Sequence, residues 1–316
     1  MKTRYNLPQQ LALLLGACLA CASAQAQSSV TLYGVVDVGL GKAQGGKFGL
    51  NNGRGSTAAN TSYHTPTRIG MRGEEDLGNG LKAQFNFETD SLVMGTGAVP
   101  GNLFNREAWV GLSGAGWGRL RAGNTTSVAF QGHIKYDLNG LSASSAMDHA
   151  GFSPLTWYGT RRAAQLQYVT PKFAGFEAGL GYVAAGNNSG QSSTQIRLDY
   201  GQGPLNVTYV AETKRIAANR TAQALGASYA VDPTFKVTGG VARSVSAARG
   251  EGWHVGAAKS FGPVTVGAQY ARNTKTDVSA TELFALYNLS KRTSLYLDVM
   301  DKTNGGAYQF GVVHRF

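Results

Sequence analysis

Residues 308–316 alternate strictly between an aromatic, apolar face and a more polar one. The first face carries Tyr308, Phe310, Val312, His314 and Phe316, and the second carries Gln309, Gly311, Val313 and Arg315. A period of two residues is the pattern of a β-strand whose two sides meet different surroundings. A chain built from such strands must place their apolar sides against a protein core or against lipid.

The beginning of the chain has the organisation of an export signal. Basic residues at positions 2 and 4 precede an apolar stretch, residues 11–22, and residues 24–26 form a small-x-small cleavage site. We therefore expect residues 1–26 to be a cleaved signal peptide and residues 27–316 to be the mature protein.

Both cysteines, Cys18 and Cys21, lie inside the predicted signal. Residues 15–18 loosely fit a lipid-attachment box, so a lipoprotein signal is the competing interpretation. Cleavage after residue 26 leaves a mature chain without cysteine. This excludes disulfides, a thiol nucleophile and cysteine metal sites.

The chain is basic. Its formal charge is +11, and removal of a signal that contains two cations and no acid lowers it to +9. Such an excess is typical of proteins that bind nucleic acid, that contact an anionic membrane surface or that conduct anions through a lumen. Export argues against nucleic acid.

No mature segment approaches the roughly 18 consecutive apolar residues of a transmembrane helix. A membrane-spanning chain of this kind must be a closed barrel, and the alternative is a secreted, soluble all-β protein.

Strict alternation recurs at residues 30–40, 81–90, 194–200 and 263–271. A soluble sandwich also alternates. Long charged side chains on the polar faces suit a water-filled lumen, however, and aromatic residues near strand ends suit the girdles of a transmembrane barrel.

Short turns separate the strands in pairs. Seven of them can be located, at residues 77–80, 113–116, 171–175, 201–204, 232–234, 261–263 and 290–292. Seven periplasmic turns imply eight hairpins with both chain ends on the same side. We therefore expect an all-β fold: a 16-stranded antiparallel transmembrane β-barrel that occupies residues 27–316 as one domain.

Three connections are much longer, at residues 41–66, 91–105 and 124–160. Loops of this length are uncommon unless they are functional. In a wide barrel the third loop can fold inward and narrow the lumen, which is our expectation. The alternative is a flexible loop at the surface.

Four blocks of the sequence, 27–37, 67–83, 287–296 and His314-Arg315-Phe316, resemble the Gram-negative trimeric porins, in particular those of β-proteobacteria. The blocks fall at both ends and inside the chain, so the resemblance covers essentially the whole mature protein. It implies a homotrimer of 16-stranded barrels in outer-membrane lipid, each with its third loop folded into the pore.

The resemblance also implies a pore constriction. Its arginines would be Arg68, Arg106 and Arg161, and they would face the two acids of the third loop, Asp137 and Asp148. The family's usual Pro-Glu segment is missing from that loop, which suggests a more electropositive pore.

The alternation pattern can be compared with these positions. It points five arginines into the lumen: Arg68, Arg72, Arg119, Arg121 and Arg161. For Arg106 the same pattern disagrees, because Ala108 and Val110 face lipid and would turn Arg106 outward. A bulge or a loop position at the start of the strand would resolve the conflict.

The final residue matches the family's terminal phenylalanine. By that resemblance we expect Phe316, with Tyr308 and Phe310, to form a C-terminal signal for the barrel-assembly machinery. The expected location is the outer membrane of a Gram-negative bacterium.

The expected function is passive diffusion of small hydrophilic solutes and ions, with a preference for anions because clustered guanidiniums stay charged. We expect no enzyme, cofactor or metal site, since no nucleophile elbow, zinc-binding helix or phosphate loop occurs and the histidines lack ligand spacing. A solute-specific channel for a sugar or organic acid, with Phe130, Phe152 and Trp157 as a binding track, remains an alternative. A barrel enzyme of the outer membrane is a third.

Overall fold

The computed structural model describes residues 29–51, 64–90, 102–140, 142, 145–151, 160–187, 192–213, 221–244, 250–303 and 305–316. The predicted signal, 1–26, lies outside these residues and stays a prediction. The same holds for Phe152 and Trp157 of the suggested binding track.

The described residues are mostly strands. In chain order these are β1 Ser29–Lys42, β2 Gly49–Asn51, β3 Arg68–Gly78, β4 Leu81–Asp90, β5 Glu107–Gly114, β6 Gly118–Thr126, β7 Arg161–Val169, β8 Phe176–Val183, β9 Ser193–Gln202, β10 Leu205–Glu212, β11 Ala222–Asp232, β12 Phe235–Arg243, β13 Glu251–Phe261, β14 Val264–Asn273, β15 Val278–Asn288, β16 Thr293–Lys302 and β17 Ala307–Arg315. The short helices are α2 Val128–His133, η1 Ile134–Tyr136, α3 Ala146–His149 and η2 Ala185–Asn187.

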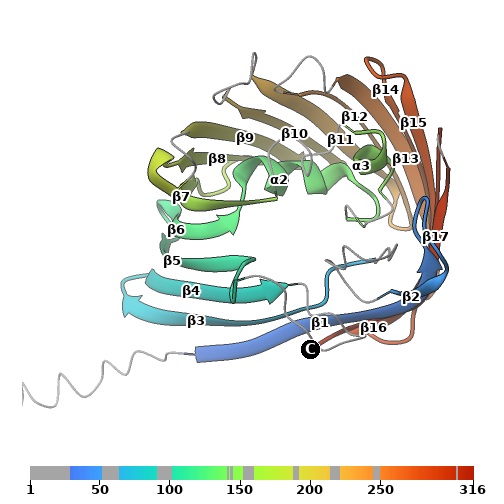
Figure 1. The fold of residues 1–316 in the computed structure, drawn as a ribbon. Helices are drawn as coiled ribbons and strands as arrows, with labels where there is room; N and C mark the ends of the chain where they lie inside the picture. Colours follow the sequence, from blue (N-terminus) through green and yellow to red (C-terminus); the bar gives the residue numbers. More distant parts are fainter. Residues whose placement is uncertain are drawn as a thin grey trace, which may run out of the picture.

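The strands close into a ring (Figure 1). Each strand from β3 to β17 pairs with the next, and β1 closes the ring by pairing with both ends of the series. Residues Ser29–Val35 of β1 pair with β3, and Val35–Lys42 pair with β17. The three-residue β2 pairs with Gly39–Gly41 of β1, on the edge opposite β17, and is too short to count as one of the barrel strands. The 16-stranded antiparallel barrel predicted from the sequence is therefore confirmed.

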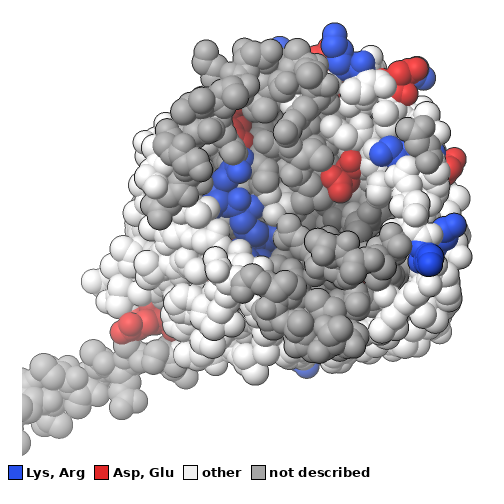
Figure 2. Space-filling model, in the orientation of Figure 1, with Lys and Arg blue, Asp and Glu red and all other residues white. Residues whose placement is uncertain are grey.

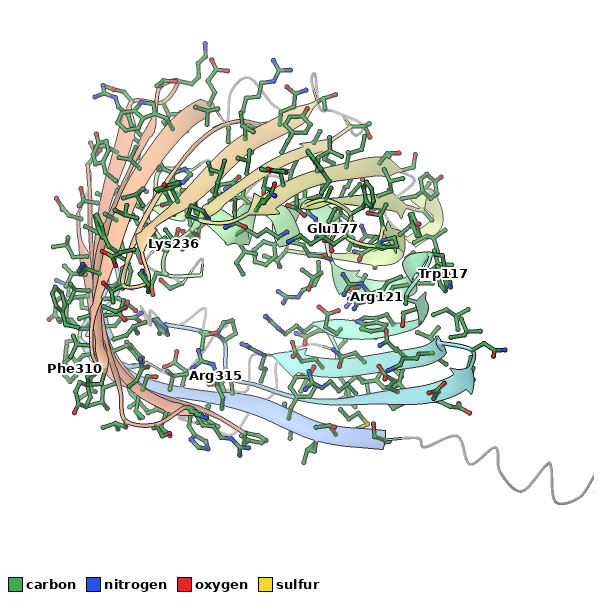
Figure 3. All side chains as sticks on the ribbon, turned by 180° about the vertical axis from the view of Figure 1, so that it is seen from behind. Trp117, Arg121, Glu177, Lys236, Phe310 and Arg315 are labelled. Carbon is green, nitrogen blue, oxygen red and sulfur yellow. The ribbon has the colours of Figure 1, made fainter. Side chains whose placement is uncertain are left out.

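The two faces of the sheet differ as the alternation predicted. On β15, Glu282 is fully buried inside the barrel, while its neighbour Leu283 is 52 % exposed on the outside. Phe310 of β17 lies on the outer surface and Arg121 of β6 on the inner one (Figure 3). Within the described ranges, no helix is both long enough and apolar enough to cross a membrane.

All seven predicted short turns join the hairpins at one end of the barrel. The turn between β3 and β4 shows why its sequence is suited to the task. Asn79 and Gly80 have φ values of 52° and 75°, in the left-handed region that asparagine and glycine tolerate best.

The third long loop folds into the lumen, as predicted, and places α2, η1 and α3 there (Figure 1). Small lumenal residues make the close approach possible. A Cβ atom at Gly132 of α2 would come within 2.4 Å of Val210 on β10. Ala129 and Met147 of the loop join a buried apolar cluster with Val210 and Ala224 of the wall.

Hydrogen bonds hold the next part of the loop to the opposite wall. The Asn139 side-chain amide donates to Glu282 Oε1 at 2.8 Å and to Asp298 Oδ1 at 2.9 Å. The Leu138 N–H donates to Gln269 Oε1 at 3.1 Å, and Gln269 in turn donates to Glu282 Oε2 at 2.8 Å. The loop is thus fixed at several points rather than free at the surface.

Two histidines enclose Tyr136 where η1 meets the wall. The ring centroid of Tyr136 lies 4.8 Å from that of His133 and 5.3 Å from that of His254 on β13. Burial, with a smaller contribution from the charge of His254, holds the pKa of His133 well below its ordinary value. Burial raises the pKa of Tyr136. The loop therefore docks with an uncharged contact at this point.

Candidate functional site

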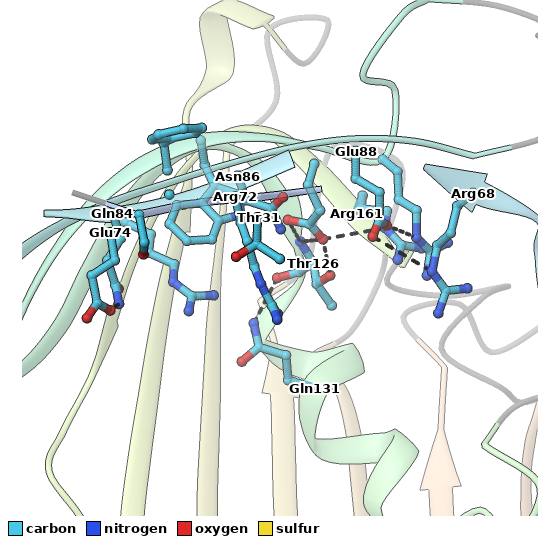
Figure 4. Close-up of a pocket in the computed structure, with 17 residues that line it drawn as sticks. Thr31, Arg68, Arg72, Glu74, Gln84, Asn86, Glu88, Thr126, Gln131 and Arg161 are labelled. Atoms are coloured by element: carbon cyan, nitrogen blue, oxygen red, sulfur yellow. Dashed lines mark hydrogen bonds and ion pairs between the residues drawn. The ribbon is translucent and has the colours of Figure 1, made fainter. Parts of the chain in front are cut away.

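A cavity of about 720 Å³ lies in the lumen beside the wall formed by β3–β7, with Gln131 of α2 among its lining residues (Figure 4). Five arginines and three glutamates line it: Arg68, Arg72, Arg106, Arg121, Arg161, Glu74, Glu88 and Glu107. The lining therefore has an excess of two positive charges. Basic side chains also gather in a row inside the mouth of the barrel (Figure 2).

Three of the arginines are ion-paired to glutamates at the loop end of the wall. Glu88 on β4 binds Arg68 Nε through Oε2 at 3.7 Å and Arg106 Nε through Oε1. Glu107 on β5 binds Arg161 Nε at 3.8 Å and accepts the N–H of Thr126 at 3.2 Å. The glutamates thus fix these guanidiniums at the edge of the cavity.

The other two arginines stack on aromatic rings. The guanidinium of Arg72 lies 5.1 Å from the ring centre of Tyr33, and that of Arg121 lies 4.2 Å from the ring centre of Trp109. Within the described part of the chain, neither forms an ion pair with a carboxylate. Stacking on a ring orients a guanidinium while it leaves the N–H groups at its edge available.

Arg119 lies outside this cavity. It is 45 % exposed, and its Nη2 lies 3.9 Å from Glu177 of β8. Glu177 also pairs with Arg197 of β9, whose Nη1 donates to the side-chain carbonyl of Gln131 on α2 at 2.8 Å. Arg119 therefore belongs to a charged network that connects the wall to α2.

The structure resolves the disagreement about Arg106. The residue precedes the first residue of β5, so the alternation of that strand does not govern it. Its side chain turns inward and is 13 % exposed beside Glu88, and its N–H donates to the backbone carbonyl of Glu88 at 3.1 Å. Phe104, two residues earlier, has a φ of 60°, which redirects the chain before the strand begins.

The expected acids of the third loop lie elsewhere. Asp137 is buried and accepts hydrogen bonds from the Asn139 N–H at 2.9 Å and the Ser145 hydroxyl at 2.7 Å, on the side of Glu282. Asp148 lies in α3. Neither residue lines the cavity with the arginines; the carboxylates that face the arginines come from strands β4 and β5.

The sequence pattern assigned no role to Glu88, Glu107 or Arg162. Glu88 does lie on the polar face of residues 81–90, so its inward direction was visible, but its partners were not. Arg162 Nη2 donates to Glu212 on β10 at 3.1 Å. It reaches the lumen beside Arg161 because the register shifts between Gly123 and Thr125, where β6 pairs with β7.

Comparison with known proteins fits this architecture. A family model described as Gram-negative porin matches residues 12–307. The chain belongs to the Gram-negative porin family. As in the family at large, we place this porin in the outer membrane of a Gram-negative bacterium, and it is a channel protein.

Individual relatives support the same conclusion. Outer membrane porin protein 32 of Delftia acidovorans is 31 % identical over 94 % of this chain and 90 % of its own length. An outer membrane porin protein of Bordetella pertussis is 33 % identical over 62 % of this chain, and that match spans 57 % of the relative. The structure of an anion-selective porin from Comamonas acidovorans, at 25 % identity, superimposes with a TM-score of 0.73 and covers 92 % of this porin and 100 % of that chain.

Proposed function

We propose that this porin forms a water-filled, anion-preferring channel for passive diffusion of small hydrophilic solutes across the outer membrane. The observation that carries the proposal is the excess of arginine over glutamate in the lumenal cavity. Fixed guanidiniums raise the local concentration of anions and lower that of cations at the narrow point of a pore. The likeness to a structure described as an anion-selective porin supports this assignment.

The charged wall acts by position rather than by number alone. Arg68, Arg106 and Arg161 are held by Glu88 and Glu107, so this group carries one net positive charge and its guanidiniums point in fixed directions. A solute that passes between this wall and the docked third loop meets hydrogen-bond donors on the wall side. The wall therefore favours carboxylates and phosphates among solutes small enough to pass.

The zero-current potential in a planar bilayer under a KCl gradient tests the proposal. We expect stepwise conductance and a potential whose sign favours chloride. The double variant Arg68→Ala, Arg161→Ala should move that potential toward the cation-favouring sign, because it leaves Glu88 and Glu107 undercompensated. A cation-favouring wild-type potential, or a double variant that behaves as wild type, would contradict the proposal.

We also propose that three copies assemble in the membrane and that Phe316, with Tyr308 and Phe310, directs the chain to the barrel-assembly machinery. Family membership supports the trimer. All three aromatic side chains lie on the outer face of β17 or at its end, with exposed fractions of 41 to 47 %. Size-exclusion chromatography with light scattering tests the first statement, and the membrane-inserted yield of Phe316→Ala tests the second.

A further inference from the structure

Two of the five arginines in the cavity have no carboxylate partner in its lining. Glu88 and Glu107 are taken up by Arg68, Arg106 and Arg161. The third acid, Glu74, forms an ion pair with Lys82 and accepts the side-chain N–H of Gln84 at 2.7 Å. No lining carboxylate is therefore left for Arg72 and Arg121.

These two guanidiniums are also prepared for a ligand. Tyr33 covers one face of Arg72, and Trp109, itself buried, covers one face of Arg121. Stacked in this way, each guanidinium presents its N–H edge in a fixed plane. The buried Nε of Arg121 has no hydrogen-bond partner among the described residues, and a buried donor without a partner is energetically costly.

The pair lies deeper in the channel than the ion-paired group. Arg72 follows Arg68 by four residues on β3, which corresponds to about 13 Å toward the short turns. Arg121 lies nearer the short-turn end of β6 than Thr126, which bonds to Glu107. Figure 4 shows Arg72 and Asn86 between Glu74 and Gln84 on one side and Glu88, Arg161 and Arg68 on the other.

We propose that Arg72 and Arg121 form a binding site for a small, doubly charged oxyanion, either a dicarboxylate or phosphate. The inference rests on the proposed anion channel and adds a specific anion-binding site within it. Each guanidinium fork binds one oxyanion edge through two N–H groups, and both forks together satisfy two negative charges. A chloride ion or a monocarboxylate can engage only one fork in this manner.

The test is block of chloride current in planar bilayers containing the full-length porin. Succinate and inorganic phosphate are added at pH 8 to a KCl solution, with acetate as the monovalent comparison. We expect both dianions to reduce the wild-type current at concentrations where acetate does not. Arg72→Gln and Arg121→Gln should each raise the half-blocking concentration about tenfold, as expected for loss of a charged hydrogen-bond pair.

Two further variants separate recognition from charge. Arg121→Lys keeps the charge and loses the planar fork, so its half-blocking concentration should also rise several-fold. Arg292→Gln removes an equal charge from an exposed turn outside the cavity and should leave block unchanged. The slower migration of heated barrels in gel electrophoresis confirms that each variant is folded.

Each outcome decides one point. Equal block by acetate, equal effects of Arg292→Gln and Arg121→Gln, or block that persists in the Arg72→Gln, Arg121→Gln double variant would overturn the site. Block by one dianion alone would identify which class the site accepts. An anion-favouring zero-current potential without block would overturn this inference only, whereas a cation-favouring potential would overturn the proposed function itself.

Discussion

Glu88 and Glu107 lie directly opposite each other on β4 and β5, and both face the lumen. Glu88 pairs with two arginines and Glu107 with a third. Like charges directly opposite on neighbouring strands destabilise a sheet. The arginines offset that repulsion, and the glutamates in turn determine where the guanidiniums lie. Removing either partner therefore changes both the field in the pore and the order of the wall.

Replacing both glutamates with glutamine should strengthen anion preference. The Glu88→Gln, Glu107→Gln variant raises the charge excess of the cavity from two to four. The anion-to-cation permeability ratio should rise by on the order of a few-fold, given Coulomb energies near 1 kcal/mol at contact in water. The zero-current potential under a KCl gradient measures it, and an unchanged or lower ratio would argue against control by these charges.

Asn139 should be needed to dock the third loop. In Asn139→Ala, Glu282 and Asp298 each lose one buried hydrogen bond to the loop, and a hydrogen bond contributes about 1 kcal/mol. Faster amide hydrogen exchange across residues 134–151 should report the loosened loop. Asn206→Ala, at an exposed position on β10, is the matched control and should exchange as wild type.

Docking of the same loop should weaken in acid through His133. Because burial depresses its pKa in the folded protein, the unfolded or undocked form binds the proton more readily. Neutral His133 contributes fully to the free energy of docking above the pKa of about 6.5 that it has in the unfolded chain. Below that pH the contribution falls by up to about 1.4 kcal/mol per pH unit.

Single-channel current noise between pH 7.5 and pH 5 measures this effect. We expect more frequent fluctuations as the pH falls, as the loop leaves the wall. His133→Leu should reduce the pH dependence, because it replaces the titrating imidazole with an apolar side chain of similar size. A pH dependence of equal size in the variant would assign the effect to another group.

Gly226 should set how closely η1 approaches the wall. A Cβ atom at this position would lie 2.3 Å from the Tyr136 ring, so Gly226→Val should push that ring into the lumen and lower single-channel conductance. Gly239→Ala is the control, since its nearest neighbour would be at an ordinary 3.4 Å. Equal conductance in both variants would show that the wall yields instead of the loop.

The barrel was predictable because its determinants are local. Alternation and turn residues define each hairpin without reference to the others, as residues 81–90 show by matching β4 at both ends. The helices of the third loop were not predictable. The Ser127 side chain does cap α2 by accepting the Phe130 N–H at 3.1 Å, but six residues make a weak helix alone, and its position depends on Val210, distant in sequence.

The candidate site divides in the same way. Alternation placed Arg68, Arg72 and Arg121 in the lumen, because each lies within a regular strand. It failed for Arg106, which precedes β5, and gave no role to Arg162, beside the register shift of β7. The ion-pair partners depend on which strands are neighbours and in what register, which the sequence of one strand does not contain.

At Val35, strand β1 changes from pairing with β3 to pairing with β17, and this affects how the barrel forms. This residue pairs with Arg68 on one side and with Arg315 on the other, so the last seam joins positions almost a full chain length apart. Loop-closure entropy and the slow formation of non-local pairings oppose that step. Until it is complete, the sheet has two open edges able to recruit other chains. The yield of assembled barrel therefore depends on the rate of ring closure relative to the rate of edge-to-edge aggregation.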